Sequence, residues 1–171
     1  MAQLLDLLIF LIPIYFANSV PVVLGGGVPL DLGKTFGDSQ RILGEGKTIR
    51  GFCAGVLAGT VAGGIAALYY TLPFFSSPKT QFFAGFILAL GTMCGDAIGS
   101  FIKRRFKVGW GRPFVLDSVL FIIVSLILIY PVANQILYEM PNIVFFILLT
   151  VIIHPLANWI ANRGGLKNVP W

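Results

Sequence analysis

Long runs of apolar residues, separated by short polar segments, extend from one end of the chain to the other. Five of these runs approach the roughly 20 apolar residues that a helix needs to cross the hydrocarbon core of a membrane. The pattern predicts an all-α, polytopic membrane protein that forms a single transmembrane domain over residues 1–171. The predicted transmembrane helices span residues 4–24, 51–72, 81–99, 114–133 and 142–160, and the two long loops between them are residues 25–50 and 100–113.

Composition and net charge narrow the class of protein. Hydrophobic residues make up 57% of the chain and charged residues 11%, whereas charged residues make up about a quarter of a typical soluble domain. The chain is therefore expected to lie in a cell membrane. Its net charge of +5 favours anionic lipid or a phosphate-rich partner over nucleic acid. The single histidine and the two cysteines show no spacing typical of a zinc site.

Positive charges predict the orientation in the membrane, because short loops rich in Lys and Arg stay in the cytoplasm. The loops 25–50 and 100–113 together contain nine Lys and Arg residues, and Lys79 is the only one on the opposite side. Both loops are therefore predicted to face the cytoplasm, with the N-terminus outside and the C-terminus inside. The first apolar run contains Asp6 and lacks a basic start, so it is expected to remain as a transmembrane helix rather than act as a cleaved signal peptide.

Glycines recur at every fourth position in two of the predicted helices. Small residues at this spacing allow transmembrane helices to approach closely, so packing is the favoured interpretation. Both series lie towards the predicted cytoplasmic ends, and they would bring the two charged loops together. The glycines are Gly51, Gly55, Gly59 and Gly63 in one helix and Gly91, Gly95 and Gly99 in the next.

Polar residues inside the predicted spans also lie towards the cytoplasmic ends. They are Asn18, Asp96, Asp117 and Asn158. Because polar groups within a membrane usually face a cavity or one another, these four residues predict a polar pocket that opens to the cytoplasm. His154 is interpreted as a hydrogen-bonded packing residue without a catalytic role.

Asp96 and Asp117 are the candidate metal ligands. Two carboxylates, together with phosphate oxygens and water, are a usual way to hold Mg²⁺, and we expect these two to share one magnesium ion. If the third helix continues into the following loop, Ser100, Lys103 and Lys107 share a helical face with Asp96. Lys103 and Arg104 would then face the pocket. The alternative interpretation is that the cations between Lys103 and Lys107 only anchor the helix end to anionic lipid, and this interpretation is favoured for Arg105.

The loop 25–50 contains a second candidate phosphate-binding segment. Gly46, Lys47 and Thr48 resemble the end of a Walker A motif, but Arg41 occupies the position of its first glycine, so a P-loop NTPase is rejected. A glycine-rich loop that leads into a helix N-terminus, with a Lys and a Thr, can still cradle phosphate. A plain flexible loop remains the alternative interpretation.

The charged motifs resemble those of a known family. The resemblance to the phosphatidate cytidylyltransferase superfamily rests on small, polar and charged residues around two aspartates: Gly95, Asp96, Ser100, Lys103, Arg104, Asp117 and Ser118. Similarity is closest to the archaeal branch, the CDP-archaeol synthases, because of the added segments Leu43–Phe52 and Asn18–Pro21. Bacterial and eukaryotic members carry a longer motif of which only Asp117 is matched here, so a second metal site is not implied.

The resemblance implies a Mg²⁺-dependent transfer of a cytidylyl group from CTP to digeranylgeranylglyceryl phosphate, an unsaturated archaeal ether-lipid phosphate, with release of pyrophosphate. The lipid phosphate is already ionised near neutral pH, so the reaction needs positioning and charge neutralisation rather than a general base. The catalytic and phosphate-binding candidates are Lys47, Arg50, Lys103, Arg104 and Arg112. The residues expected to shape or line the site are Asn18, Gly44, Gly46, Thr48, Ser100 and Asn158.

Other classes of function remain as alternatives. A transporter would need broken helices and related halves, and the chain shows no evident internal repeat. A small non-enzymatic membrane subunit would explain the glycines and the basic loops, but not two aspartates at helix ends. A glycerol-phosphate acyltransferase is the nearest enzymatic alternative, because it also handles a lipid phosphate.

Overall fold

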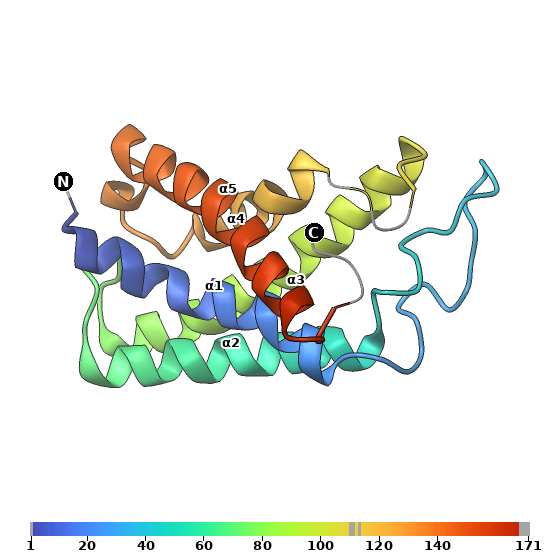
Figure 1. Ribbon diagram of the computed structural model, residues 1–171. Coiled ribbons are helices and arrows are strands. Elements are labelled where there is room, and N and C mark those ends of the chain that lie inside the picture. Colours follow the sequence, from blue (N-terminus) through green and yellow to red (C-terminus); the bar gives the residue numbers. More distant parts are fainter. Residues whose placement is uncertain (1, 110–111, 113, 168–171) are drawn as a thin grey trace.

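The structure is a computed structural model that describes residues 2–109, 112 and 114–167. These residues form five α-helices and one short 3₁₀ helix, with no β-strand among them. Residues 110, 111 and 113 of the predicted loop 100–113 lie outside the described part. In chain order the elements are α1 (Leu4–Leu24), α2 (Ile49–Tyr69), α3 (Pro78–Arg105), α4 (Val115–Ile129), η1 (Gln135–Tyr138) and α5 (Met140–Arg163) (Figure 1).

The predicted all-α, multi-pass membrane architecture is confirmed, although helix bounds differ from the prediction. Among the described residues, α1, α2, α3 and α5 are long and apolar enough to cross a membrane, and α4 is a shorter apolar helix of 15 residues. α4 ends at Ile129 rather than at residue 133, near Pro131, which has no N–H for a helical hydrogen bond and disfavours helical geometry at the residue before it. α3 continues past its predicted end at Gly99 to Arg105.

The starts of α2 and α3 are encoded by short capping sequences. The Thr48 hydroxyl accepts a hydrogen bond from the Gly51 backbone N–H at 3.1 Å, and Ser77 accepts one from the Thr80 N–H at 3.1 Å. Pro78 occupies the first turn of α3, where its missing N–H costs nothing. Thr48 therefore has a structural role at the point where the loop 25–48 enters α2.

Glycines allow the helices to pack backbone to backbone. α1 packs on α2, α2 on α3, α3 on α4, and α5 on α4. A Cβ atom added at Gly59 would lie 2.6 Å from both the Pro13 carbonyl oxygen of α1 and the Ala89 Cβ of α3. One added at Gly95 would lie 2.6 Å from the Leu120 carbonyl oxygen of α4. The packing interpretation of the two glycine series is confirmed.

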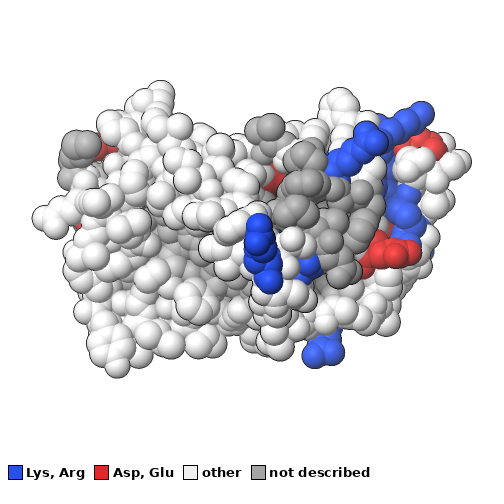
Figure 2. All heavy atoms as spheres, in the orientation of Figure 1, with Lys and Arg blue, Asp and Glu red and all other residues white. Residues whose placement is uncertain are grey.

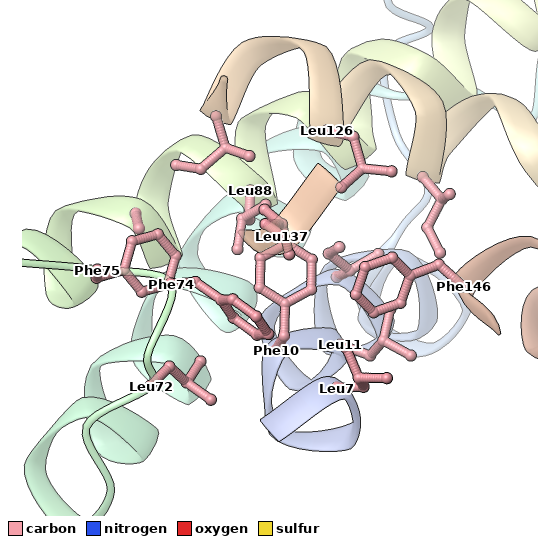
Figure 3. Packing of buried hydrophobic residues seen from close by; sticks show 14 of the residues in the cluster. Leu7, Phe10, Leu11, Leu72, Phe74, Phe75, Leu88, Leu126, Leu137 and Phe146 are labelled. Carbon is pink, nitrogen blue, oxygen red and sulfur yellow. The ribbon is translucent and has the colours of Figure 1, made fainter. Parts of the chain in front are cut away.

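The largest apolar core lies towards the end of the bundle that holds the N-terminus. Aromatic side chains from α1, from the α2–α3 connection and from α5 meet there, and the Phe10 ring centroid lies 5.6 Å from that of Phe74 and 5.1 Å from that of Phe146 (Figure 3). Many other apolar side chains, such as Leu57 and Ile152, are exposed on the outside of the bundle. An apolar exterior suits a surface that contacts lipid.

The opposite end of the bundle is basic. Residues 25–48 extend beyond the ends of α1 and α2, on the same side as the C-terminal end of α3 (Figure 1). In the space-filling view, Lys and Arg side chains gather over this end (Figure 2). We call this region the basic end, and define it as residues 25–48, the last turns of α3 and α5, and the first turn of α4.

Candidate functional site

A cavity of about 340 Å³ lies in the basic end. Its wall is built from α1, the loop 25–48, the first turn of α2, the C-terminal part of α3, the first turn of α4, and the last turns of α5 with the segment that follows. Most of the residues predicted for the polar pocket lie in this wall: Asn18, Gly46, Lys47, Thr48, Asp96, Ser100, Lys103, Arg104, Asp117 and Asn158. Residues far apart in the sequence therefore form one site.

Three predicted residues do not line the cavity. Gly44 is buried just behind it, where an added Cβ atom would lie 3.0 Å from the Arg104 guanidinium group. Arg50 is exposed in the first turn of α2. Arg112 is also exposed, and its carbonyl oxygen accepts a hydrogen bond from Lys103 Nζ at 2.7 Å. The structure therefore gives Arg50 and Arg112 no place in the cavity wall, and it places Gly44 as backbone support.

Two ion pairs in the cavity wall join different elements of the fold. Lys47 Nζ lies 2.5 Å from Asp96 Oδ2, which joins the loop 25–48 to α3. Lys103 Nζ lies 2.5 Å from Asp117 Oδ2, which joins α3 to α4. The continuation of α3 places Asp96, Ser100 and Lys103 in the same wall, as their shared helical face predicts. The prediction is wrong for Lys107, because α3 ends at Arg105 and Lys107 has a φ of +53°, which is not helical.

The donor set fits a hard cation that is also bound by substrate phosphates. Within the described residues, no group of three or more His, Cys, Asp or Glu side chains could hold a metal ion without other ligands. The cavity does contain two carboxylates, Asp96 and Asp117. Mg²⁺ keeps several waters and commonly takes one or two carboxylates together with phosphate oxygens. The cavity wall thus fits a magnesium–phosphate complex better than a closed metal site.

Asp31 organises the loop 25–48, a role that the sequence reasoning missed. Its carboxylate is fully buried and accepts hydrogen bonds from Arg41 Nη2 at 2.6 Å and from the backbone N–H groups of Leu43 and Gly44 at 3.0 Å. The hydrogen bond from Arg41 holds the pKa of Asp31 well below its usual value. The backbone just before Gly46 is therefore hydrogen-bonded to the buried Asp31 carboxylate, so this segment is not a plain flexible loop.

Arg104 and Arg105 leave the end of α3 in different environments. Arg104 lines the cavity, and its Nε atom is buried without a hydrogen-bond partner in the described part of the chain. The Arg105 Nε atom is buried without a partner among the described residues as well, so it is the place of Arg104 in the cavity wall that makes its donor available to a ligand oxygen. Arg105 pairs with Asp38 at 2.6 Å, and its guanidinium carbon lies 4.9 Å from the Phe36 ring centroid. Arg105 thus ties the loop 25–48 to the end of α3, a role that its interpretation as a lipid anchor did not include.

The sequence reasoning also missed part of the wall contributed by α5 and the residues after it. His154 lies in the wall, with Nδ1 3.1 Å from Ser118 Oγ and its ring 5.3 Å from that of Phe121. Its hydrogen bonding was predicted, but its place in the cavity wall was not. Lys167 lines the cavity as well. The available signal was the pair Gly164 and Gly165, because glycine just after a helix reverses the chain.

Fold and site together define a class: a multi-pass helical membrane protein with a cavity at one end of its bundle that is lined by carboxylates and by Lys and Arg side chains. The comparisons with known proteins narrow this class. The family model described as CarS-like, CDP-archaeol synthase, matches residues 1–171. The chain belongs to the CDP-archaeol synthase family and is therefore an enzyme.

Individual relatives agree with the family model. The chain is 49% identical over 134 residues to the CDP-archaeol synthase of Pyrococcus horikoshii, covering 77% of this chain and 78% of the relative. It is 44% identical over 171 residues to that of Pyrococcus abyssi, covering 95% of each. The Archaeoglobus fulgidus enzyme is 40% identical over 185 residues, covering 98% of this chain and all (100%) of the relative.

A solved structure supports the fold independently. It is described as an intramembrane enzyme for archaeal membrane lipids biosynthesis, and it superimposes with a TM-score of 0.77 at 34% sequence identity. The match covers 91% of this chain and 94% of that chain. The acyltransferase, transporter and non-enzymatic alternatives are set aside, because family and fold agree on a lipid-biosynthetic membrane enzyme.

Proposed function

We propose that this enzyme transfers a cytidylyl group from CTP to an archaeal ether-lipid phosphate, digeranylgeranylglyceryl phosphate, and releases pyrophosphate. The observation that carries the proposal is the cavity at the basic end, which combines two carboxylates with several cations. Membership of the CDP-archaeol synthase family supplies the reaction. A site within a membrane bundle suits a substrate whose chains stay in the lipid while its phosphate enters a polar cavity.

In the proposed reaction an oxygen of the lipid phosphate attacks the α-phosphorus of CTP. A new phosphorus–oxygen bond joins the two substrates as the bond between the α- and β-phosphate groups breaks, and pyrophosphate leaves. Both substrates are anionic, so the main task of the enzyme is to bring negative charges together in line. Lys47, Lys103 and Arg104 line the cavity and supply positive charge for this task. The proposed reaction requires no general base.

Asp96 and Asp117 would hold Mg²⁺ in the proposed site. The ion would neutralise part of the triphosphate charge when it is bound. Each aspartate is paired with a lysine in the structure, and a cation at the carboxylates would release Lys47 and Lys103 to contact phosphate oxygens. The carboxylates of the wall would then bind the metal ion and its lysines would bind the substrate phosphates, so no further charged side chains are needed.

The proposed site faces the cytoplasm, where CTP is made. Support comes from the basic end, because Lys and Arg are retained on the cytoplasmic side of membranes. Lys47 and Lys103 belong both to the basic end and to the cavity wall.

Replacement of either metal-binding candidate tests the proposal. Asp96→Asn and Asp117→Asn are each expected to lower Mg²⁺-dependent cytidylyl transfer by on the order of 100-fold or more, because one ligand and its negative charge are lost. The measurement is the rate of CDP-lipid formation from CTP and the lipid phosphate by purified protein. Glu45→Gln is the control, because the Glu45 side chain is 86% exposed and lies outside the wall. Near-normal turnover in both aspartate variants would disprove the metal assignment.

A further inference from the structure

The segment after α5 folds back onto the helix instead of leaving the bundle. Gly165 has a φ of +73°, a conformation that glycine adopts without strain. The Leu166 N–H donates to the Ala161 carbonyl oxygen at 2.8 Å, and the Asn162 side chain donates to the Lys167 carbonyl oxygen at 2.8 Å. The turn formed by residues 164–167 is thus attached to the last turn of α5 at both the backbone and the side-chain level.

The turn places the Lys167 side chain in the cavity wall. Lys167 lines the same cavity as Asp96 and Asp117. Its Nζ atom donates a hydrogen bond to Asn158 Oδ1 at 2.9 Å, and the Asn158 amide nitrogen lies 3.3 Å from His154 Nε2. A chain of side chains on α5 therefore orients the ammonium group.

The charges of the wall favour an anion beside Lys167. Among the described residues of the wall, the cationic side chains are Lys47, Lys103, Arg104 and Lys167, and the carboxylates are Asp96 and Asp117. Four positive and two negative charges leave an excess of two positive charges, which a phosphate group would balance. Burial also lowers the pKa of Lys167 from its usual value, and a bound anion would offset this cost of burying the ammonium group.

We propose that Lys167 is a further substrate-binding residue, whose ammonium group binds a phosphate oxygen in the cavity, and that the turn of residues 164–167 is part of the site. The proposal rests on the proposed function for the identity of that phosphate, which belongs to CTP or to the lipid phosphate. Asn158 is then a positioning residue, because its amide oxygen accepts the hydrogen bond from Lys167 Nζ.

Kinetics of the full chain test the proposal. The variants are Lys167→Ala, the conservative Lys167→Arg, and Arg163→Ala as a matched control. Arg163 is the neighbouring cation at the end of α5, where its guanidinium carbon lies 5.0 Å from the Trp159 ring centroid and outside the cavity wall. Values of KM and kcat are measured separately with CTP and with the lipid phosphate as the varied substrate.

Lys167→Ala is expected to raise one KM roughly tenfold or more, the size of effect typical of a lost hydrogen bond to a charged group. The substrate whose KM rises identifies the source of the phosphate. Lys167→Arg should recover most of the affinity, and Arg163→Ala should behave like the wild type. A KM for both substrates that matches the Arg163→Ala control would overturn the proposal. The proposal would also be overturned if the activity lost in Lys167→Ala were accounted for by the fraction of the protein that is unfolded under the assay conditions.

A binding measurement keeps this test separate from the test of the proposed function. Inorganic tripolyphosphate is added to the detergent-solubilised full chain, and the shift in unfolding temperature is recorded without any turnover. We expect a smaller shift for Lys167→Ala than for the wild type and Arg163→Ala. Equal shifts in all three proteins would count against Lys167 even if cytidylyl transfer is confirmed. An absence of cytidylyl transfer in the wild type, with the expected pattern of shifts, would instead reject only the proposed function.

Discussion

Asp31 shows how a single buried charge prepares a loop for function. Its carboxylate joins Arg41 to the backbone of Leu43 and Gly44, and Gly44 in turn packs against the Arg104 guanidinium group. A buried carboxylate is stabilised only when several donors surround it. The conformation of the segment that brings Gly46 to the cavity wall thus depends on Asp31, which lies outside the wall.

Asp31→Asn should loosen the loop 25–48. The Arg41 guanidinium group loses its ionic partner, and an amide N–H replaces an acceptor that faces backbone donors. We expect proteolysis of the loop to accelerate by on the order of tenfold in the folded protein, because local opening becomes easier. Glu45→Gln is the control, because its exposed pair with Arg41, at 3.7 Å, contributes little. Equal cleavage rates in both variants would contradict this role of Asp31.

The low pKa of Asp31 also predicts a dependence on pH. Because the folded state lowers the pKa below its usual 3.8, the ionised carboxylate stabilises the fold at every pH above that value. This contribution is lost as the pH falls below 3.8 towards the folded pKa. The difference in unfolding temperature between wild type and Asp31→Asn should therefore stay constant from about pH 5 to 8 and shrink only in stronger acid. A difference that changes between pH 5 and 8 would contradict the assignment.

At the scale of elements, α2 is the helix that depends most on its small residues. It packs against both α1 and α3, and its glycines lie close to backbone or side-chain atoms of both helices. An added side chain at Gly59 meets Pro13 on one side and Ala89 on the other. The glycine series thereby fixes how closely α1 and α3 approach α2, and these two helices contribute Asn18 and Asp96 to the cavity wall.

Gly59→Leu should destabilise the bundle by about 1–3 kcal/mol or more, because overpacking forces the helices apart. Thermal unfolding of the purified protein in lipid or detergent measures the effect. Val61→Leu, on the exposed side of the same helix, adds a methylene group towards lipid and should leave the unfolding temperature almost unchanged. Equal stability of the Gly59→Leu variant and the control would show that α2 does not need close packing.

At the scale of the whole molecule, the two ends of the bundle differ in their positive charge. Lys79 lies at the start of α3, at the end opposite to the loop 25–48. Both the cavity and the excess of Lys and Arg belong to the basic end. The charge distribution from which the orientation is predicted therefore also supplies the cations of the site.

Cysteine labelling should reveal the orientation. After replacement of Cys53 and Cys94 by alanine, Gly37→Cys places a thiol in the loop 25–48 and Ser76→Cys places one in the α2–α3 connection, both at exposed positions. A membrane-impermeant maleimide added to intact cells should label Ser76→Cys and should label Gly37→Cys only after the membrane is opened. The reverse pattern would place the basic end, and the cavity with it, outside the cell.

The sequence by itself determined the elements and the chemical class of the site. Runs of apolar residues near 20 long specify membrane helices, and polar residues are costly enough inside them that Asp96 and Asp117 had to share a polar environment. The glycine series specified close packing because residues without a side chain, repeated on one face of a helix, allow another helix to approach. These features were predictable because each depends on the chain alone and on the solvent around it.

The tertiary structure decided which residues complete the wall. Asp31 meets Gly44 across a loop, and Lys167 reaches the cavity because the turn after α5 reverses the chain. Arg50 and Arg112 fit the same charge pattern as Lys47 and Lys103, yet they lie exposed outside the wall. Charge and spacing show that a side chain can bind phosphate. Whether that side chain reaches the cavity depends on how the helices pack and how the loops fold back, and no local pattern in the sequence encodes this.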